Sequence, residues 1–220
     1  MDTVHPDSGA RNELLDVTGI SPDLPSRLVR QLEFIAEIDR LKTVLRLSPL
    51  LAADRRENDA EHSWHLAMMV LVLAEYAAEP IDIERTLKLV LVHDLVEIYA
   101  GDTCLFDDAA KADQHEREAA AASKLFALLP ADQNAHFLAL WEEFEARTTA
   151  EARFAKAMDR LQPLLLNAGN AGGTWRTPGV TEERVRQRTS VIADGSPRLW
   201  DLTQKLFALG VREGWLRNSP

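Results

Sequence analysis

Apolar residues recur at helical spacing along most of the chain. After Pro25 they step by three or four positions up to Ser48-Pro49, which is typical of one buried face of an amphipathic helix. Further segments of this kind end at Glu79-Pro80, Gly101 and Pro130. The pattern predicts helices over about 26–47, 60–77, 83–100, 107–129, 131–146, 150–168, 181–193 and 197–213. No segment alternates convincingly with a period of two, so we expect no strands.

These helices predict an all-α fold, a single helical bundle of about eight helices over residues 24–220. Residues 1–23 mix Pro, Gly, Asp and Ser without periodicity, and they are predicted to form a loose N-terminal arm. The length of 220 residues and the hydrophobic content of 46% suit one domain with a sizeable core. The Gly-rich segment 167–179 is interpreted as a connecting loop.

Charge and composition narrow the function classes. The chain has 25 Lys and Arg against 35 Asp and Glu, a net charge of −10, which argues against a nucleic-acid-binding protein. Its one cysteine, Cys104, excludes an internal disulfide framework and a Cys-rich zinc module. Residues 1–11 carry no apolar signal segment, and no apolar stretch approaches the length of a membrane span. We therefore expect a cytoplasmic protein with no membrane partner.

Polar residues occupy positions that should be apolar. His93 and Asp94 lie within LVLVHDLVEI, and Glu97 shares their helix face. His62 begins another apolar helix, and Asp159 lies within FAKAMDRLQPLLL. Burying a carboxylate is costly unless it is paired or bound to a metal. Two imidazoles and two carboxylates that converge from three helices would form a site for a divalent cation.

Each of these residues alone has a plainer explanation. A single buried histidine is more often hydrogen-bonded within a core than bound to a metal, and Asp159 could pair with Arg153 or Arg160. His65, one turn after His62, is either a core residue or a support for His62. Only the combination, in this order along the chain, is specific.

That order resembles the HD-domain metal-dependent phosphohydrolase superfamily, in which one His is followed by an adjacent His-Asp pair and a distant Asp. The segments EHSW (61–64), LVHDLVEIYAGD (91–102), LWEEFEARTTAEARFAKAMDRLQ (140–162) and GGTW (172–175) resemble the branch that contains the bacterial 5′-deoxynucleotidases and their eukaryotic relatives. The resemblance covers about residues 28–210.

The resemblance implies one divalent metal ion, and the sequence does not distinguish Co, Mn, Mg, Zn, Ni or Fe. Glu97 matches the family's catalytic glutamate, and Asp102 matches an aspartate of the nucleotide pocket, so both are catalytic candidates. The implied metal ligands are His62, His93, Asp94 and Asp159.

The phosphate-binding arginine is less sharply defined. Arg46 lies near the position of the family's phosphate-binding arginine, while Arg55 and Arg56 are alternatives for the same role. The family often has a tryptophan beside that arginine, where it limits acceptance of a 2′-hydroxyl. Leu47 follows Arg46 here, so the sugar preference stays open.

The resemblance predicts hydrolysis of a small phosphorylated substrate, a nucleoside 5′-monophosphate, with Glu97 handling a proton of the attacking water. One alternative is a non-catalytic nucleotide-binding sensor, and another is a phosphohydrolase that acts on a non-nucleotide phosphate ester. Family members are often dimers, so the chain is compatible with a homodimer. A second metal site at His115 and His136 is disfavoured, because neither residue lies in an apolar helix.

Overall fold

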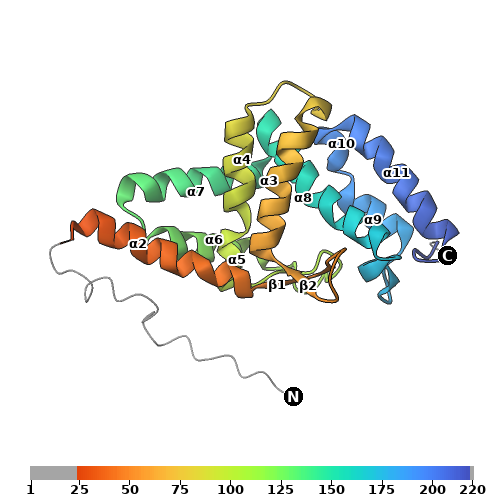
Figure 1. The fold of residues 1–220 in the computed structure, drawn as a ribbon, viewed down its shortest axis with the longest axis horizontal. Coiled ribbons are helices and arrows are strands. Elements are labelled where there is room, and N and C mark those ends of the chain that lie inside the picture. Colours follow the sequence, from red (N-terminus) through yellow and green to blue (C-terminus); the bar gives the residue numbers. More distant parts are fainter. Residues whose placement is uncertain (1–23, 219–220) are drawn as a thin grey trace, which may run out of the picture.

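The computed structural model describes residues 24–218, and helices dominate it (Figure 1). The predicted N-terminal arm, residues 1–23, lies outside the described residues. The helices are α2 (Ser26–Ile38), α3 (Asp59–Leu73), α4 (Ile83–Val92), α5 (Glu97–Ala100), α6 (Gln114–Phe126), α7 (Ala131–Ala146), α8 (Ala150–Gly169), α9 (Glu182–Thr189), α10 (Ile192–Gly195) and α11 (Pro197–Arg212). Short 3₁₀ helices span Asp39–Thr43, Ala74–Tyr76, His93–Val96 and Gly173–Arg176, and a hairpin joins β1 (Leu45–Pro49) to β2 (Arg56–Asn58). The all-α fold class is therefore confirmed.

Helix α8 is the centre of the fold. It packs against α3, α4, α7, α10 and α11, and in Figure 1 it crosses behind the upright pair α3 and α4. Its first turn is capped by Thr149, whose hydroxyl accepts a hydrogen bond from the Ala152 amide at 3.1 Å. Phe154, Met158 and Leu161 are fully buried along its length. Asp159 therefore lies on the most buried helix of the molecule.

Helices α3 and α4 begin at well-defined caps. The Asn58 side chain accepts from the Glu61 amide at 3.0 Å, and the Glu61 carboxylate accepts from the Asn58 amide at 3.1 Å. Asp82 caps α4 by accepting from the Arg85 amide at 3.0 Å. The cap of α3 fixes its first turn, so the His62 side chain lies in the core against α8.

The predicted continuous helix over 83–100 is interrupted. α4 ends at Val92, and His93–Val96 forms a 3₁₀ turn before α5 begins. In this turn the His93 ring bonds to the Val90 carbonyl at 2.9 Å, and Asp94 accepts from Arg46 at 2.8 Å. Such a tightened segment within a helix is frequent at functional sites.

The expectation of no strands is wrong for residues 45–58. α2 ends at Ile38, and the chain then forms β1, which pairs antiparallel with β2 through Leu45–Asn58 and Pro49–Arg56, with an irregularity between them. In β1 the leucines are exposed while Arg46 and Ser48 face inward. The polar side of β1 thus faces inward and its leucines face outward. Leu45 also continues the helical spacing of the apolar residues before it, so the segment resembled part of a helix face.

Two other boundaries differ from the prediction. α6 begins at Gln114 rather than near 107, because Asp107 caps a turn at Ala110 and the Arg117 guanidinium binds carbonyls of the preceding loop. The predicted helix over 181–193 is divided into α9 and α10. Within residues 24–218, no helix combines the length and apolarity needed to cross a membrane.

We expect Gly195→Ala to destabilise the fold by about 1–3 kcal/mol. A methyl group there would press on the Arg153 carbonyl and lie 2.8 Å from the Ala157 Cβ, both on α8. Gly169→Ala is the matched control, since its methyl would meet only the side chain of Leu51, which is 58% exposed and can rotate away. Urea denaturation of both variants measures the difference. Equal stability of the two would contradict close packing of α10 on α8.

Candidate functional site

The structure brings the four predicted metal ligands together. His62 comes from α3, His93 and Asp94 from the 3₁₀ turn, and Asp159 from α8, and all four are buried. His62 Nε2 lies 3.3 Å from Asp159 Oδ1 and 3.8 Å from Asp94 Oδ2. His93 Nε2 lies 3.0 Å from Asp94 Oδ1 and 4.0 Å from Asp159 Oδ1. Three elements that are distant in sequence thus converge on one point.

Both imidazoles direct their Nε2 atoms at the carboxylates. The Nδ1 of His93 donates to the Val90 carbonyl at 2.9 Å, and the Nδ1 of His62 donates to Gln162 Oε1 at 3.2 Å. These bonds place the ring proton on Nδ1 and leave a lone pair on each Nε2. His93 Nε2 is buried and makes no hydrogen bond. Two such lone pairs beside two carboxylates are a donor set that fits a divalent cation.

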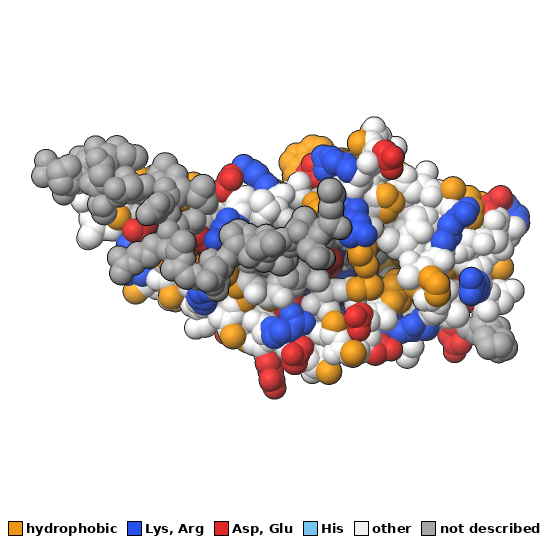
Figure 2. All heavy atoms as spheres, turned by 90° about the horizontal axis from the view of Figure 1, so that it is seen from below, with side chains coloured by type: hydrophobic (Ala, Val, Ile, Leu, Met, Phe, Trp, Pro, Cys, Tyr) orange, Lys and Arg blue, Asp and Glu red, His pale blue; other side chains and the backbone are white. Residues whose placement is uncertain are grey.

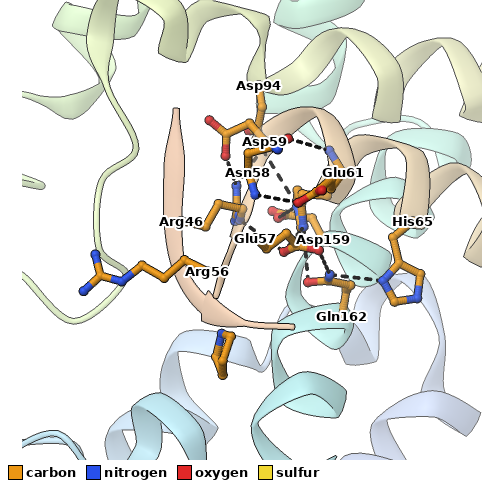
Figure 3. A network of polar contacts seen from close by, with 12 residues as sticks. Arg46, Arg56, Glu57, Asn58, Asp59, Glu61, His65, Asp94, Asp159 and Gln162 are labelled. Carbon is orange, nitrogen blue, oxygen red and sulfur yellow. Dashed lines mark hydrogen bonds and ion pairs between the residues drawn. The ribbon is translucent and has the colours of Figure 1, made fainter. Parts of the chain in front are cut away.

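Gln162 and Glu57 fix the orientation of His62, and sequence reasoning missed both. Figure 3 shows Gln162 between Glu57 and His65: its Nε2 donates to Glu57 Oε1 at 2.6 Å and to His65 Nδ1 at 3.2 Å. With its amide nitrogen engaged twice, Gln162 must present its oxygen to His62. The available signal in the sequence was an amide side chain, Gln162, three residues after Asp159 within an apolar stretch.

A second group of carboxylates lies beside the first. Carboxylate oxygens of Asp59, Asp94 and Glu97 lie within 4.8 Å of one another, and all three residues are buried. Arg46 partly compensates them, since its Nη1 donates to Asp94 Oδ2 at 2.8 Å and to Asp59 Oδ1 at 3.0 Å. Glu97 Oε2 is buried without a hydrogen-bond partner. The structure thus places Glu97 beside the candidate metal centre, and it adds Asp59, which sequence reasoning missed.

The carboxyls of this second group differ in pKa although all three are buried. Burial and the neighbouring Asp94 raise the pKa of Glu97 well above its usual range, and they raise the pKa of Asp59 to about 6. Burial also acts on Asp94, but His93 and Arg46 outweigh it and hold its pKa below the usual range. Asp94 therefore carries charge at lower pH than usual, while Glu97 and Asp59 keep their protons to higher pH than usual.

Asp159 is held in its charged form by cations on its own helix. Burial would raise its pKa, but Arg160 and Lys156 outweigh burial and hold the pKa of Asp159 well below its usual range. The Lys156 Nζ lies 3.5 Å and the Arg160 Nη1 3.8 Å from Asp159 Oδ2. The sequence offered Arg160 as a partner of Asp159, whereas Lys156 was not singled out.

Two adjoining cavities open beside the cluster. The first, about 470 Å³, is lined by charged residues, and we call it the charged cavity. The second, about 530 Å³, is lined by more apolar residues, among them Leu47, Phe106, Pro163 and Trp175, and we call it the apolar cavity. Both are lined by Arg46, Asp102, Thr103, Leu105 and Arg160. The predicted pocket residue Asp102, which follows Gly101 at φ 75°, thus borders both cavities.

Of the three candidate arginines, only Arg46 lines these two cavities. Arg55 is on the surface, where it pairs with Glu61 at 2.9 Å. Arg56 is exposed on β2, and in Figure 3 its side chain points away from the cluster. The structure places neither Arg55 nor Arg56 at a cavity wall. His115 lines the charged cavity and stacks on Trp141, with ring centroids 6.1 Å apart.

Residues 38–200 match the HD domain family. This chain belongs to that family. The match includes β1, the 3₁₀ turn and α8, so it contains the whole residue cluster described above.

Known relatives of this HD domain protein include proteins named as nucleotidases. The human protein 5′-deoxynucleotidase HDDC2 is 32% identical over 135 residues, which cover 61% of this chain and 65% of the human one. The fission yeast (Schizosaccharomyces pombe) protein 5′-deoxynucleotidase hdd1 is 28% identical over 134 residues, covering 59% and 66%. The matched part thus spans about 65% of the length of these relatives.

Solved structures share the fold. A protein described as a predicted metal-dependent phosphohydrolase from Magnetospirillum magnetotacticum MS-1 is 53% identical, with a TM-score of 0.82 over 87% of this chain and 96% of that one. The PH0347 protein from Pyrococcus horikoshii OT3 is 24% identical, with a TM-score of 0.59 over 81% and 99% of the chains, and it supports the fold alone.

We expect His93→Ala to remove stoichiometric divalent metal from the purified protein, because it deletes an Nε2 donor. Gln162→Leu should keep the donors but weaken metal affinity by about 10–100-fold, since His62 loses the partner that fixes its tautomer. Metal analysis and competition with a chelator measure both effects. Asn170→Leu, on the chain beyond the end of α8, is a control. Wild-type metal affinity in both His93→Ala and Gln162→Leu would exclude this centre.

Stability of the metal-free protein should fall as pH rises. Asp59, with a folded pKa of about 6, and Glu97, with a raised pKa, bind protons that the unfolded chain releases near pH 4. Their contribution is complete below the unfolded pKa and is lost as pH rises through the folded pKa. We expect the melting temperature to fall by about 5 °C between pH 5 and pH 8 in chelator.

Asp94 and Asp159, whose pKa values are lowered, lose their contribution only as pH falls below the unfolded value, outside this window. Excess divalent cation should flatten the slope by replacing the protons, and Glu97→Gln should flatten it without cation. The same slope in all three samples would show that these carboxyls do not control it.

Proposed function

We propose that this chain is a metal-dependent phosphomonoesterase that hydrolyses nucleoside 5′-monophosphates, in the manner of the 5′-deoxynucleotidases it resembles. Membership in the HD domain family and the names of its relatives support this function. The single observation that carries it is the convergence of two imidazole Nε2 atoms and two carboxylates at the wall of a charged cavity, with Glu97 beside them.

One divalent ion would be held by His62, His93, Asp94 and Asp159. When bound, a divalent ion supplies Lewis acidity, which lowers the pKa of water and offsets charge on phosphoryl oxygens. The protein contributes orientation: Gln162 and the Val90 carbonyl hold the two imidazoles in the Nδ1–H tautomer. A preformed site of this kind does not need to rearrange when substrate enters.

Glu97 is the proton-handling group of this proposal. It lies on the first turn of α5, buried, with one carboxylate oxygen free of hydrogen bonds and facing the acidic cluster. A bound cation would lower the raised pKa of Glu97 and so favour the carboxylate form, which acts as a general base. Arg46 lines both cavities, and its guanidinium suits the oxygens of the phosphate group.

The apolar cavity is the proposed place of the nucleoside. Asp102 stands where both cavities meet and would accept a hydrogen bond from a sugar hydroxyl. Leu47 lines this cavity in place of the tryptophan common in the family, and Trp175 lines its far side. Trp64, on α3, is 64% exposed and lines neither cavity. We therefore propose weak discrimination against a 2′-hydroxyl, which turnover of dAMP against AMP measures.

A phosphate-release assay over nucleoside monophosphates and simple sugar phosphates, with Mn²⁺, Co²⁺ or Mg²⁺ added, tests the function. Release from nucleoside monophosphates in preference to sugar phosphates supports it. The reverse preference favours the non-nucleotide phosphohydrolase. Nucleotide binding without release in any metal favours a non-catalytic sensor. The homodimer and the cytoplasmic location stay predictions.

Glu97→Gln should lower kcat by about 10²–10⁴-fold, which is the usual contribution of a general acid–base group. The metal content should stay near wild type, because the four-ligand set is intact. KM should change little, since Arg46 and the cation centre still hold the phosphate. Metal content, melting temperature and kcat are measured on one preparation. A metal-loaded Glu97→Gln protein with near-normal kcat would remove Glu97 from the mechanism.

A further inference from the structure

The charged cavity gathers cations in a protein that is acidic as a whole. The chain has a net charge of −10, and Lys and Arg side chains are scattered over the face seen in Figure 2 rather than concentrated there. Around this one cavity, by contrast, cationic side chains arrive from the loop 101–113, the end of α7, α8 and α9. Besides Arg46, they are Lys111, Arg147, Lys156, Arg160 and Arg188.

The two cations next to Asp159, Lys156 and Arg160, already have acidic partners. Lys156 Nζ lies 3.3 Å from Glu145 Oε1 and 3.5 Å from Asp159 Oδ2, and Arg160 contacts the same Asp159 oxygen at 3.8 Å. These two side chains therefore belong to the edge of the metal centre. They suit the phosphate group that reacts there.

Two further cations of this cavity, Lys111 and Arg188, are poorly compensated by negative charge. Within residues 24–218, Lys111 Nζ makes one side-chain hydrogen bond, to the Gln114 amide oxygen at 3.3 Å, and no ion pair. Arg188 shares the single carboxylate of Asp108 with Arg184, so two guanidinium groups meet one negative charge. Burial, together with Arg160, Arg188 and Lys156, lowers the pKa of Lys111, as expected for a lysine surrounded by other cations.

The charged cavity is lined by as many acidic as basic residues, but no ion pair joins any of these acids to Lys111 or Arg188 within residues 24–218. Glu118 lines the same cavity, but burial raises its pKa, and it accepts a hydrogen bond from Gln114 at 2.6 Å. Asp108 is already the partner of Arg184 and Arg188 of α9. An anion that enters the outer part of the cavity would meet Lys111 and Arg188 from two different elements.

We propose that Lys111 and Arg188 form an anion subsite that holds the second phosphate group of a ligand whose first phosphate group lies at the His/Asp cluster. The inference rests on the proposed function, because it takes the cluster as the place of the first phosphate. The ligand class is a diphosphate, supplied either as a nucleoside 5′-diphosphate or as inorganic pyrophosphate.

The experiment compares inorganic pyrophosphate with inorganic orthophosphate, by calorimetry on the full-length metal-loaded protein at a fixed free metal concentration. Wild type should bind pyrophosphate at least about tenfold more tightly than orthophosphate. Lys111→Met should remove most of this preference and leave orthophosphate affinity within about twofold, while Lys111→Arg should retain it. Lys205→Met, which removes the same charge from an exposed position on α11, is the matched control and should behave as wild type.

Equal affinity of wild type for the two anions would overturn the proposal, as would an equal effect of Lys111→Met and Lys205→Met. Melting temperatures without ligand identify any variant that fails to fold, and Lys111→Gln then replaces it. Because binding is measured without turnover, absence of nucleotidase activity would reject the proposed function and leave this test standing. Tighter binding of dADP than of pyrophosphate would assign the diphosphate to a nucleotide, and equal binding would assign it to free pyrophosphate.

Discussion

The ion pair between the buried Asp94 and Arg46 is the contact on which the rest of the site depends. A carboxylate in a helical core is costly unless cations or hydrogen bonds compensate it. Arg46 Nη1 donates to Asp94 Oδ2 at 2.8 Å. Burial and the neighbouring Asp94 raise the pKa values of Glu97 and Asp59. The charge of Asp94 therefore helps to set the protonation of the two carboxyls beside it.

The local structure around this contact is irregular in two segments, β1 and the 3₁₀ turn. β1 turns its polar side inward, which delivers Arg46 to the core, and its leucines stay exposed. The helix that carries His93 tightens to a 3₁₀ turn at the same point. β1 packs on α8, and the 3₁₀ turn packs against α6 and α7. The regular helices α3 and α8 supply His62 and Asp159, and these two irregular segments supply Arg46, His93 and Asp94.

The site combines two different environments. On one side, buried imidazoles are oriented by Gln162 and by a main-chain carbonyl. On the other side, cations from α8, α9 and the loop 101–113 face the cavity. Arg46 and Asp102 stand at the boundary, since they line the charged and the apolar cavity alike. A phosphorylated ligand with an apolar portion would be complementary to this arrangement.

The sequence by itself determined the helical class and the chemistry of the centre. Strong periodicity identified α7, α8 and α11 nearly to their ends, and polar residues inside apolar helices identified His62, His93, Asp94, Glu97 and Asp159. Periodicity reports which side of one element is buried. It does not report which side chains of different elements meet. The inverted hairpin, the choice of Arg46 over Arg55 and Arg56, the Gln162–Glu57 support and the gathering of Lys111 with Arg188 depend on how distant segments pack, and only the tertiary structure decided them.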